Sequence, residues 1–461
     1  MSLEENTDSR TDSDGDDDDR DIDEDAHKTQ VYLHYDFSTK DQELALPIFD
    51  VQKEILAKIA QNRVVVIKGE TGSGKSTQVP QFILDEAVEK NRHCNIVVTQ
   101  PRRIAAISLA SRVCKERGWQ LGKLVGYQVG LDNCTDPDTR VSYVTTEVLV
   151  QKMVHQHSLN KYTHIILDEV HERDCHTDFA LLIVKKLLYT VSPNVKIILM
   201  SATIDASKFA HYFASPVMKQ LVPAPIISAG KATAYSIWIF YLDDLHVICK
   251  DKPNIIPKLP SISPEVPGIS KDMYKLATEM IKYFDCIERH EESCLPTEFP
   301  KNRGAVLAFL PGLPEIENYM NFLSSESSRF RWLLFPLHST ITQEEQQSVF
   351  TMPPSGFRKI IISTNVAESS ITLPDIKYVI DFCLTKVLTC DEVTNYTSLK
   401  LTWASQASCQ QRAGRSGRVS TGRVYRLVPQ NLFKVSKING MCLIHSSLVC
   451  SIILGMIRLK I

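Results

Sequence analysis

The sequence predicts an α/β protein in which two parallel sheets, each flanked by helices, follow one another along the chain. Its 461 residues exceed what one ordinary α/β domain needs and suffice for two. Short β-branched runs, typical of strands buried on both faces, occur in two series. Segments with helical spacing lie between several of these runs, as the crossovers between parallel strands require.

The first series predicts a lobe over residues 47–222, after an N-terminal extension at 28–46. The lobe is expected to open with a helix at 47–59, because Pro47 stands at a position suited to a helix start. The other elements expected here are helices at 77–89 and 103–117 and strands at 64–67, 96–98, 141–144, 165–167 and 197–200.

The second series predicts a lobe over residues 223–433. Prolines cluster near its start, so we expect an inserted loop at about 253–270, followed by a helix at 271–284. The strands expected in this lobe are 306–310, 333–335, 359–363, 378–381 and 424–427.

Charge is distributed very unevenly along the chain. The formal net charge is −2, but residues 1–26 hold 13 Asp or Glu against Arg10 and Arg20. Like charges at that density repel and little apolar surface is available, so we expect a disordered acidic tail at 1–27. The remaining chain is basic by about nine charges, which suits phosphate-bearing partners. The tail is either a solubilising appendage or a mimic of nucleic acid that competes for a basic cleft.

Cysteine usage and hydropathy exclude several classes of protein. None of the 12 cysteines forms a CxxC pair, so we expect no structural zinc and reduced thiols. Residues 441–457 are apolar but short and interrupted by His445, so we expect no membrane span. Residues 434–461 are predicted to be a short, atypical C-terminal tail.

A phosphate-binding loop follows the first predicted strand. Residues 69–76 match GxxxxGK[ST] between a strand and a helix, the context that this motif requires. Its backbone N–H groups and the helix N-terminus attract phosphate. We expect Lys75 to reach the β- and γ-phosphates of ATP and the Ser76 hydroxyl to bind Mg²⁺. The residues expected to contact the nucleotide here are Gly69, Glu70, Thr71, Gly72, Ser73, Gly74, Lys75, Ser76 and Thr77.

An acidic pair ends the fourth predicted strand, where a carboxylate faces the phosphate loop of the same sheet. We expect Asp168 to hold Mg²⁺ and Glu169 to act as the general base on the attacking water. Small hydroxyl residues end the next strand. Ser201 and Thr203 are expected to bond His171 and Glu169, which would couple the phosphate state to lobe movement.

Arginines recur near the end of the second lobe. Arg412, Arg415 and Arg418 are three residues apart, which predicts guanidinium groups along one helical face. A planar guanidinium contacts phosphate oxygens bidentately. Arginines supplied by the second lobe would make hydrolysis depend on lobe closure, and such fingers contribute about 10³–10⁵ in rate.

Four blocks together resemble the DEAH-box family of superfamily 2 helicases, whose lobes are RecA-like P-loop NTPase domains. The blocks are Thr99-Gln100-Pro101-Arg102-Arg103, Ser201-Ala202-Thr203, residues 363–370 and residues 411–418. The resemblance covers about residues 47–433 and implies an ATP-dependent RNA helicase. It further implies that Gln411 positions the hydrolytic water and that Arg415 and Arg418 are the fingers. Arg112 and Phe350 match the pair that sandwiches the base.

This chain departs from the family pattern at two places. Pro374 occupies the usual Asp position of motif V, and we do not transfer the nucleotide contact of that Asp to Asp375. Thr145-Thr146-Glu147 stands where the usual motif reads Thr-Asp-Gly, which alters a loop expected to contact RNA.

A track for nucleic acid is predicted along the strand ends. Arg102 and Arg103 suit backbone phosphates. The neutral hydrogen-bonding side chains expected on the same rim are Thr145, His338, Ser339, Thr364 and Asn365. Such a track reads phosphate and sugar, which suits single-stranded RNA or RNA–protein complexes with weak sequence preference. A hairpin predicted at 385–402 either wedges strands apart or extends the sheet.

Within the family, residues 125–131, 168–173 and 378–384 resemble the germline Tudor-domain helicases. That resemblance implies partners among piRNA-pathway proteins and a role in transposon silencing during meiosis and germ-cell differentiation. It also implies a cytoplasmic location in perinuclear germ granules (nuage).

Three functions remain open from the sequence. They are an RNA-stimulated ATPase, an ATP- and RNA-binding scaffold of piRNA ribonucleoproteins with little unwinding, and a DNA translocase. The complete set of catalytic residues favours an enzyme. DEAH-box motors continue into further domains after the second lobe, so we expect this helicase-core fragment to bind ATP but unwind weakly.

Overall fold

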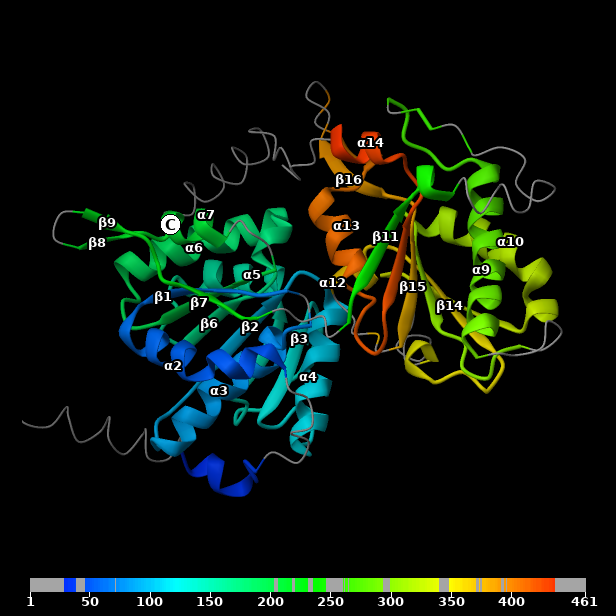
Figure 1. Ribbon diagram of the computed structural model, residues 1–461. Helices are drawn as coiled ribbons and strands as arrows, with labels where there is room; N and C mark the ends of the chain where they lie inside the picture. Colours follow the sequence, from blue (N-terminus) through cyan, green and yellow to red (C-terminus); the bar gives the residue numbers. More distant parts are fainter. Residues whose placement is uncertain are drawn as a thin grey trace, which may run out of the picture.

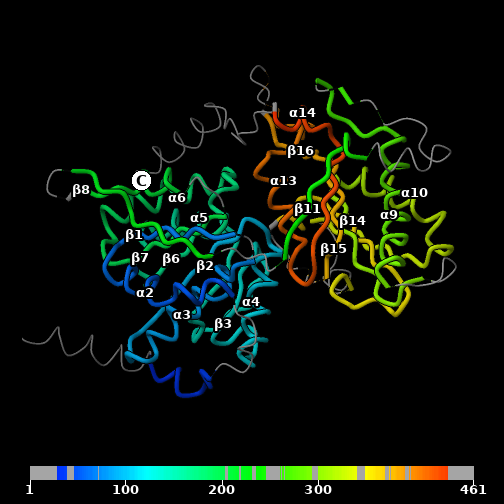
Figure 2. The backbone as a smooth tube through the Cα atoms, viewed as in Figure 1, coloured from blue at the N-terminus to red at the C-terminus, as the bar shows by residue number. Residues whose placement is uncertain are grey.

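The structure is a computed structural model that describes the chain in segments. These are residues 29–38, 46–70, 72–202, 206–217, 220–230, 235–245, 260, 262–263, 265–292, 299–339, 348–369, 373, 375–390, 394 and 396–435. The predictions for the acidic tail at 1–27, for nearly all of the tail at 434–461, for Thr71 and Thr203, and for half of the loop at 253–270 lie outside the described residues. Two lobes lie side by side (Figure 1; Figure 2).

The first lobe is built on an eight-stranded sheet with the strand order β10-β1-β7-β6-β2-β5-β3-β4. Its strands are parallel except for β4, which runs antiparallel to β3. The strands are β1 (Val64–Lys68), β2 (Ile96–Gln100), β3 (Val125–Val129), β4 (Asp132–Cys134), β5 (Val141–Thr145), β6 (His164–Leu167), β7 (Lys196–Ser201) and β10 (Ile226–Ser228).

Helices cover both faces of this sheet because successive side chains of a strand point to opposite sides. In β1, Val65 and Ile67 pack toward one face, and Val64 and Val66 toward the other. The first face is covered by α2 (Gln52–Gln61), α3 (Lys75–Glu89) and α4 (Arg103–Arg117). The second is covered by α5 (Thr146–Gln156), α6 (Cys175–Thr190) and α7 (Ala206–Tyr212). The expected doubly wound sheet is confirmed.

The second lobe has a six-stranded sheet with the order β11-β18-β15-β12-β14-β13, and every pair in it is parallel. The strands are β11 (Ile237–Tyr241), β12 (Ala305–Phe309), β13 (Trp332–Leu337), β14 (Arg358–Ser363), β15 (Ile376–Asp381) and β18 (Gly422–Arg426). Helices α9 (Lys271–Glu291) and α10 (Leu313–Phe330) pack on one face. Helices α12 (Val366–Ser369) and α13 (Gln406–Ala413) pack on the other. Both lobes are therefore the RecA-like type that the sequence predicted.

The chain passes from one sheet to the other later than expected. We expected the second lobe to begin at residue 223, but β10 pairs with β1 through Val66 and Ile226. The first lobe therefore continues to Ser228, and the second sheet begins with β11 at Ile237. The prediction missed β10 because three residues are too short to form a recognisable strand pattern.

Two hairpins, one short helix and four 3₁₀ turns complete the described structure. The expected hairpin is present as β16 (Leu384–Cys390) paired antiparallel with β17 (Thr397–Trp403). A second hairpin joins β8 (Ser215–Val217) to β9 (Gln220–Val222). The other pieces are α14 (Gln430–Val435) and the 3₁₀ turns Val31–His34, Pro47–Val51, Val170–Glu172 and Leu242–Leu245. Among the residues that the structure places, no helix is long and apolar enough to cross a membrane.

A buried ion cluster joins α9 to the second sheet. The Asp285 carboxylate accepts hydrogen bonds from Arg303 at 2.7 Å and from Arg358 at 2.5 Å. Arg358 also donates to Glu288 at 2.5 Å. All four side chains are buried, so each charge depends on the others for compensation.

Candidate active site

The phosphate loop between β1 and α3 is shaped by glycine. Gly72 and Gly74 have φ angles of 92° and 93°, a left-handed conformation that side chains other than glycine rarely adopt. A Cβ on Gly69 would lie 2.9 Å from Ala229 Cβ and from Ser73 Oγ. No side chain caps the N-terminus of α3 at Gly74. The N–H groups of this helix end are therefore available to an anion, and the contact with phosphate stays a prediction.

Lys75 lies under this loop, with 5% of its surface exposed. Its Nζ donates to the carbonyl oxygens of Gly69 at 2.5 Å and Glu70 at 3.0 Å, and to Ser73 Oγ at 3.3 Å. Burial lowers the pKa of Lys75, while the nearby carboxylates of Glu169 and Asp168 raise it. The ammonium group thus sits among oxygen acceptors, in a place where phosphate oxygens can take over as partners.

Asp168 follows β6 and is buried beside the loop, with 2% of its surface exposed. Its Oδ1 accepts from the backbone N–H of Glu169 at 2.8 Å, and its Oδ2 accepts from Gln100 Nε2 at 2.6 Å. Burial and the neighbouring Glu169 charge raise the pKa of Asp168 to about 6, against a hydrogen bond from Ser76 that lowers it.

The oxygens around Asp168 suit a magnesium ion. A carboxylate and the Ser76 hydroxyl are hard oxygen donors of the kind that Mg²⁺ prefers. A divalent cation would also compensate two buried carboxylates whose pKa values burial raises. Ser76 and Asp168, the predicted ligands, are therefore close enough to act together.

Glu169 follows Asp168 in a left-handed backbone conformation, which residues other than glycine rarely adopt. Its φ is 53°, and 8% of its surface is exposed. Its Oε2 is buried without a hydrogen-bond partner within the described part of the chain, although His171 Nδ1 is 3.4 Å away. Burial raises the pKa of Glu169, and Lys75 and Arg415 lower it. A buried acceptor without a partner is suited to receiving a proton from water.

His171 connects the acidic pair to the end of β7 and to α13 of the second lobe. Its Nδ1 accepts from the backbone N–H of Ala202 at 3.3 Å, and its Nε2 contacts the side-chain amide of Gln411 in the second lobe. Burial lowers the pKa of His171, which favours the neutral ring. The sequence assigned a direct bond at this point to Ser201 and Thr203. The described bond to His171 comes from the Ala202 backbone, and the Ser201 carbonyl accepts from Gly69 N at 3.0 Å. The side-chain bonds expected of Ser201 and Thr203 stay predictions, and Thr203 lies outside the described residues.

The arginine block is not one continuous helical face, contrary to the prediction. Helix α13 ends at Ala413, and the turn that follows carries Arg415 and Arg418. Arg412 is still in the helix and is bound within its own lobe, to Asp381 at 2.8 Å and Glu368 at 3.2 Å. Gly414 ends the helix, so the three-residue spacing no longer fixes the direction of the two later side chains.

The two later arginines face the first lobe. Arg415 is 1% exposed, and its Nε donates to the Glu368 carbonyl at 2.9 Å. Burial and Arg418 lower the pKa of Arg415 to about 9, against the charge of Glu169 in the other lobe. Burial and Arg112 of the first lobe lower the pKa of Arg418 to about 10. Arg418 Nη2 is buried without a partner among the described residues. Both guanidinium groups thus lie at the seam between the lobes.

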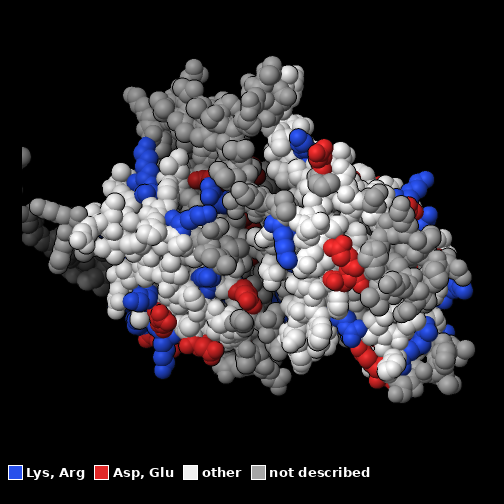
Figure 3. All heavy atoms as spheres, turned by 45° about the horizontal axis from the view of Figure 1, so that its top comes forward, with Lys and Arg blue, Asp and Glu red and all other residues white. Residues whose placement is uncertain are grey.

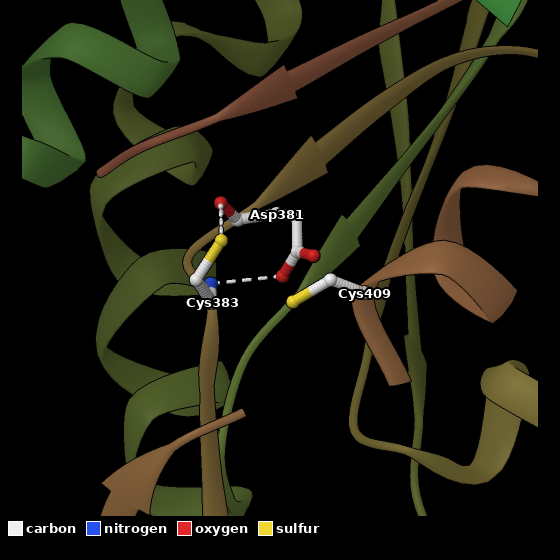
Figure 4. A group of neighbouring side chains, drawn as sticks. All are labelled: Asp381, Cys383 and Cys409. Carbon is white, nitrogen blue, oxygen red and sulfur yellow. Dashed lines mark hydrogen bonds between the residues drawn. The ribbon is translucent and has the colours of Figure 1, made fainter. Parts of the chain in front are cut away.

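A cluster of Asp381, Cys383 and Cys409 links α13 to the end of β15 (Figure 4). Their potential ligand atoms lie within 4.8 Å of one another. Asp381 Oδ1 accepts from Cys383 N at 2.8 Å and from Arg412. Burial raises the pKa of the Cys383 thiol. Because the Arg412 guanidinium already neutralises Asp381, this cluster anchors the helix that precedes the finger residues.

The two residues expected to sandwich the base come from opposite lobes. Arg112 lies on α4 and donates to Glu116 at 2.9 Å, and its charge lowers the pKa of Arg418. Phe350 belongs to the second lobe and is 42% exposed. Their stacking on a base stays a prediction.

The first half of the predicted nucleic-acid rim borders a pocket of about 450 Å³. Its lining includes Arg103 and Thr145, which the sequence had placed there. It also includes Glu147 of the altered loop and two polar residues that the sequence did not single out, Asp174 and His176. Arg102 is paired with Glu172 through two hydrogen bonds of 3.0 and 3.1 Å. On the face that Figure 3 shows, Lys and Arg side chains are interspersed with Asp and Glu.

The second half of the rim lies at the matching edge of the other sheet. Thr364 follows β14, and its N–H donates to the carbonyl of Leu337, the last residue of β13, at 3.2 Å. His338 and Ser339 follow β13 directly, and Asn365 follows Thr364. All four therefore lie after the carboxyl ends of adjacent parallel strands, as predicted from the sequence. Their contact with RNA stays a prediction.

Comparisons with known proteins agree with this geometry. Residues 49–211 match the model of the DEAD/DEAH box helicase family, and residues 291–420 match that of the helicase conserved C-terminal domain. ATP-dependent RNA helicase TDRD9 from Mus musculus is 50% identical over 392 residues, or 84% of this chain and 28% of the relative. Probable ATP-dependent RNA helicase spindle-E from Drosophila erecta is 47% identical over 415 residues, or 88% of this chain and 28% of the relative.

The matched regions contain both halves of the site. The chain spans 28% of the length of these curated relatives, so the likeness concerns their two-lobe core. The phosphate loop and the acidic pair lie within the first matched region, and Gln411, Arg415 and Arg418 lie within the second. With two matched domains in tandem, each on a RecA-like sheet, this chain belongs to the DEAD/DEAH-box helicase family.

Proposed function

We propose that this chain is an RNA-stimulated ATPase, the core of an ATP-dependent RNA helicase. One observation carries the proposal: Arg415 of the second lobe lies close enough to Glu169 of the first for the charge of each to shift the pKa of the other. An active site divided between two lobes makes hydrolysis sensitive to how the lobes approach each other. Nucleic acid that spans both rims can therefore control the reaction.

The residues divide the work of hydrolysis as follows. Glu169 accepts a proton from the attacking water, whose oxygen forms a bond to the γ-phosphorus while the bond to the β-γ bridging oxygen breaks. Gln411 orients that water. Lys75, Arg415 and Arg418 stabilise the negative charge on the phosphate oxygens. Mg²⁺, held by Ser76 and Asp168, would supply further charge neutralisation on the β- and γ-phosphates.

His171 is well placed to report the phosphate state to the second lobe. It lies 3.4 Å from Glu169 and contacts Gln411 across the seam. A displacement of either partner changes the other contact, because both involve the same ring. Coupling between hydrolysis and lobe movement would run through this histidine, as the sequence suggested for His171, Ser201 and Thr203.

RNA is the proposed polymer because the relatives named above are RNA helicases. The rim pocket with Arg103, Thr145 and His176 supplies the polar groups that a sugar–phosphate backbone needs. ATP turnover should be measured with single-stranded RNA, with DNA of the same sequence, and with neither. Stimulation by RNA supports the proposal. Equal stimulation by DNA would favour a DNA translocase, and turnover without any polymer dependence would favour a scaffold.

The germline role is proposed from the resemblance to Tudor-domain helicases. It comprises piRNA-pathway partners, transposon silencing, and a cytoplasmic location in perinuclear granules. Germ cells in which the encoding gene carries the Glu169→Gln change provide the test. Increased transposon transcripts with normal protein levels support the role, whereas unchanged transcripts and a diffuse distribution of the protein contradict it.

A further inference from the structure

Gln100 connects two parts of the first lobe, the carboxylate of Asp168 and the rim predicted to bind nucleic acid, which have separate roles in the proposed mechanism. It is the last residue of β2 and is 3% exposed. Its side-chain amide donates to Asp168 Oδ2 at 2.6 Å. Because β2 and β6 are neighbours, with Thr99 opposite Leu167, the next residue of each chain segment, Gln100 or Asp168, lies beside the other. The other carboxylate oxygen of Asp168 is held by Glu169 N, so two donors fix the orientation of the carboxylate.

The backbone of Gln100 belongs to the nucleic-acid rim. It pairs in register with Thr145, and its carbonyl accepts from Thr146 Oγ1 at 3.4 Å. Thr145 and Thr146 line the rim pocket, as does Pro101, the residue after Gln100. One residue is therefore bonded through its main chain to the rim and through its side chain to the carboxylate expected to hold Mg²⁺.

We propose that Gln100 is a positioning residue that couples occupancy of the rim to the binding of magnesium–nucleotide. This inference rests on the proposed function. A hydrogen bond to a carboxylate is strong and directional, so the amide restrains rotation of Asp168 and leaves its remaining lone pairs directed toward Ser76. Nucleic acid bound at Thr145 and Pro101 shifts the end of β2, and the Gln100 side chain transmits that shift to Asp168.

Loss of the amide donor has a specific consequence. Partners that orient a metal-binding side chain typically contribute about 10–100-fold to metal affinity. Gln100→Leu removes the donor without adding a charge beside Asp168. In this variant, the Mg²⁺ concentration that gives half of the full nucleotide affinity should rise by about tenfold or more. Nucleotide affinity in EDTA should remain unchanged.

Equilibrium binding of a fluorescent ADP, titrated with Mg²⁺ in the absence of RNA, measures this shift without requiring catalysis. Asn95→Leu is the matched control, since Asn95 lies just before the opposite end of β2 and its amide donates to the Lys161 carbonyl at 2.9 Å. The control should titrate as the unchanged chain does. If Gln100→Leu also titrates like the unchanged chain, or loses the same affinity in EDTA, the positioning role is excluded.

Repeating the titration with a uridine homopolymer tests the coupling. In the unchanged chain, the RNA should alter the affinity for magnesium–nucleotide, and in Gln100→Leu that alteration should shrink toward none. An equal RNA effect in both proteins contradicts the coupling. Failure of the proposed function has a different signature: the unchanged chain itself would bind no nucleotide or would not respond to RNA.

Discussion

At the scale of single residues, the site is governed by charges that burial has made unfavourable. Asp168 and Glu169 are adjacent, nearly inaccessible, and have pKa values raised chiefly by burial. Lys75 has a pKa lowered by the same cause. Groups in this condition gain most when an ion or a phosphate arrives, because the incoming charge replaces the water that they have lost.

Glu169→Gln tests the general base. The substitution preserves shape and breaks no bond at Oε2, which has no partner among the described residues. An amide cannot accept the proton, so RNA-stimulated phosphate release should fall by about 10²–10⁴-fold. Binding of fluorescent ADP should persist. Glu86→Gln, which removes an exposed charge paired with Lys90, serves as the control and should retain full turnover. Turnover within a few-fold of the unchanged chain would exclude Glu169 as the base.

Asp168→Asn tests how far the buried charge of Asp168 destabilises the folded protein. This destabilisation depends on pH, because only the ionised carboxylate carries the charge. The pKa of Asp168 is raised from 3.8 to about 6 in the folded protein. A raised carboxyl pKa gives stability that is present below 3.8 and is lost as the pH rises through 6. The nucleotide-free variant should therefore exceed the unchanged chain in unfolding free energy at pH 7.5, by on the order of 2 kcal/mol. The gain should disappear near pH 4. Thermal unfolding at both values measures it, and a gain independent of pH would contradict the assignment.

The residues proposed to carry out the chemistry could be predicted from the sequence, but the groups that hold them in place could not. Lys75, Ser76, Asp168 and Glu169 were predictable because their motifs impose residue types. The Ala202 contact was not, because it is a backbone N–H that any residue supplies. Gln100 stood within a recognised block, yet nothing in the pattern showed that β2 and β6 are neighbours.

At the scale of elements, the second lobe depends on charge as well as on apolar packing. Helix α9 is joined to the sheet through Asp285, which forms ion pairs with both Arg303 and Arg358. All three side chains are at most 1% exposed. Such a cluster makes the position of α9 specific, because sliding the helix would leave buried charges without partners.

Asp285→Ala should therefore be strongly destabilising. Two guanidinium groups would lose their main partner inside the protein, at a cost of about 3–5 kcal/mol. Urea denaturation followed by circular dichroism measures the loss. Asp272→Ala on the same helix is the matched control, since its pair with Lys275 is exposed and should contribute less than about 1 kcal/mol. Equal losses in the two variants would show that the cluster is not what fixes α9.

Most elements were predictable because buried parallel strands are almost continuously apolar. Helix α4 was predicted with its exact bounds, and the ten expected strands are all present. The strands that were missed have other patterns. β11 is an edge strand with Trp238 59% exposed, and β3 contains Gly126 and a half-exposed Gln128. The direction of Arg415 and Arg418 was also beyond reach, because it depends on where α13 ends.

At the scale of the whole molecule, the proposed active site lies at the seam between the two lobes. Ile104 of the first lobe packs against the apolar cluster of the second, and Gln411 contacts His171. Two tandem sheets were predictable from the sequence. Their relative placement was not, because no local pattern records a contact between residues 240 positions apart.

Hydrolysis by Arg418→Ala tests the shared site most directly. Arg418 is the better choice of the two fingers, because its Nη2 has no partner within the described chain, whereas Arg415 donates to the Glu368 carbonyl. Arg423→Ala, which removes an exposed pair with Glu291, is the control. The account predicts that single-turnover hydrolysis in the presence of RNA falls about 10³-fold in Arg418→Ala while affinity for ATP stays within about threefold. Hydrolysis by Arg418→Ala at the rate of Arg423→Ala would contradict it, because catalysis would then need nothing from the second lobe's arginine.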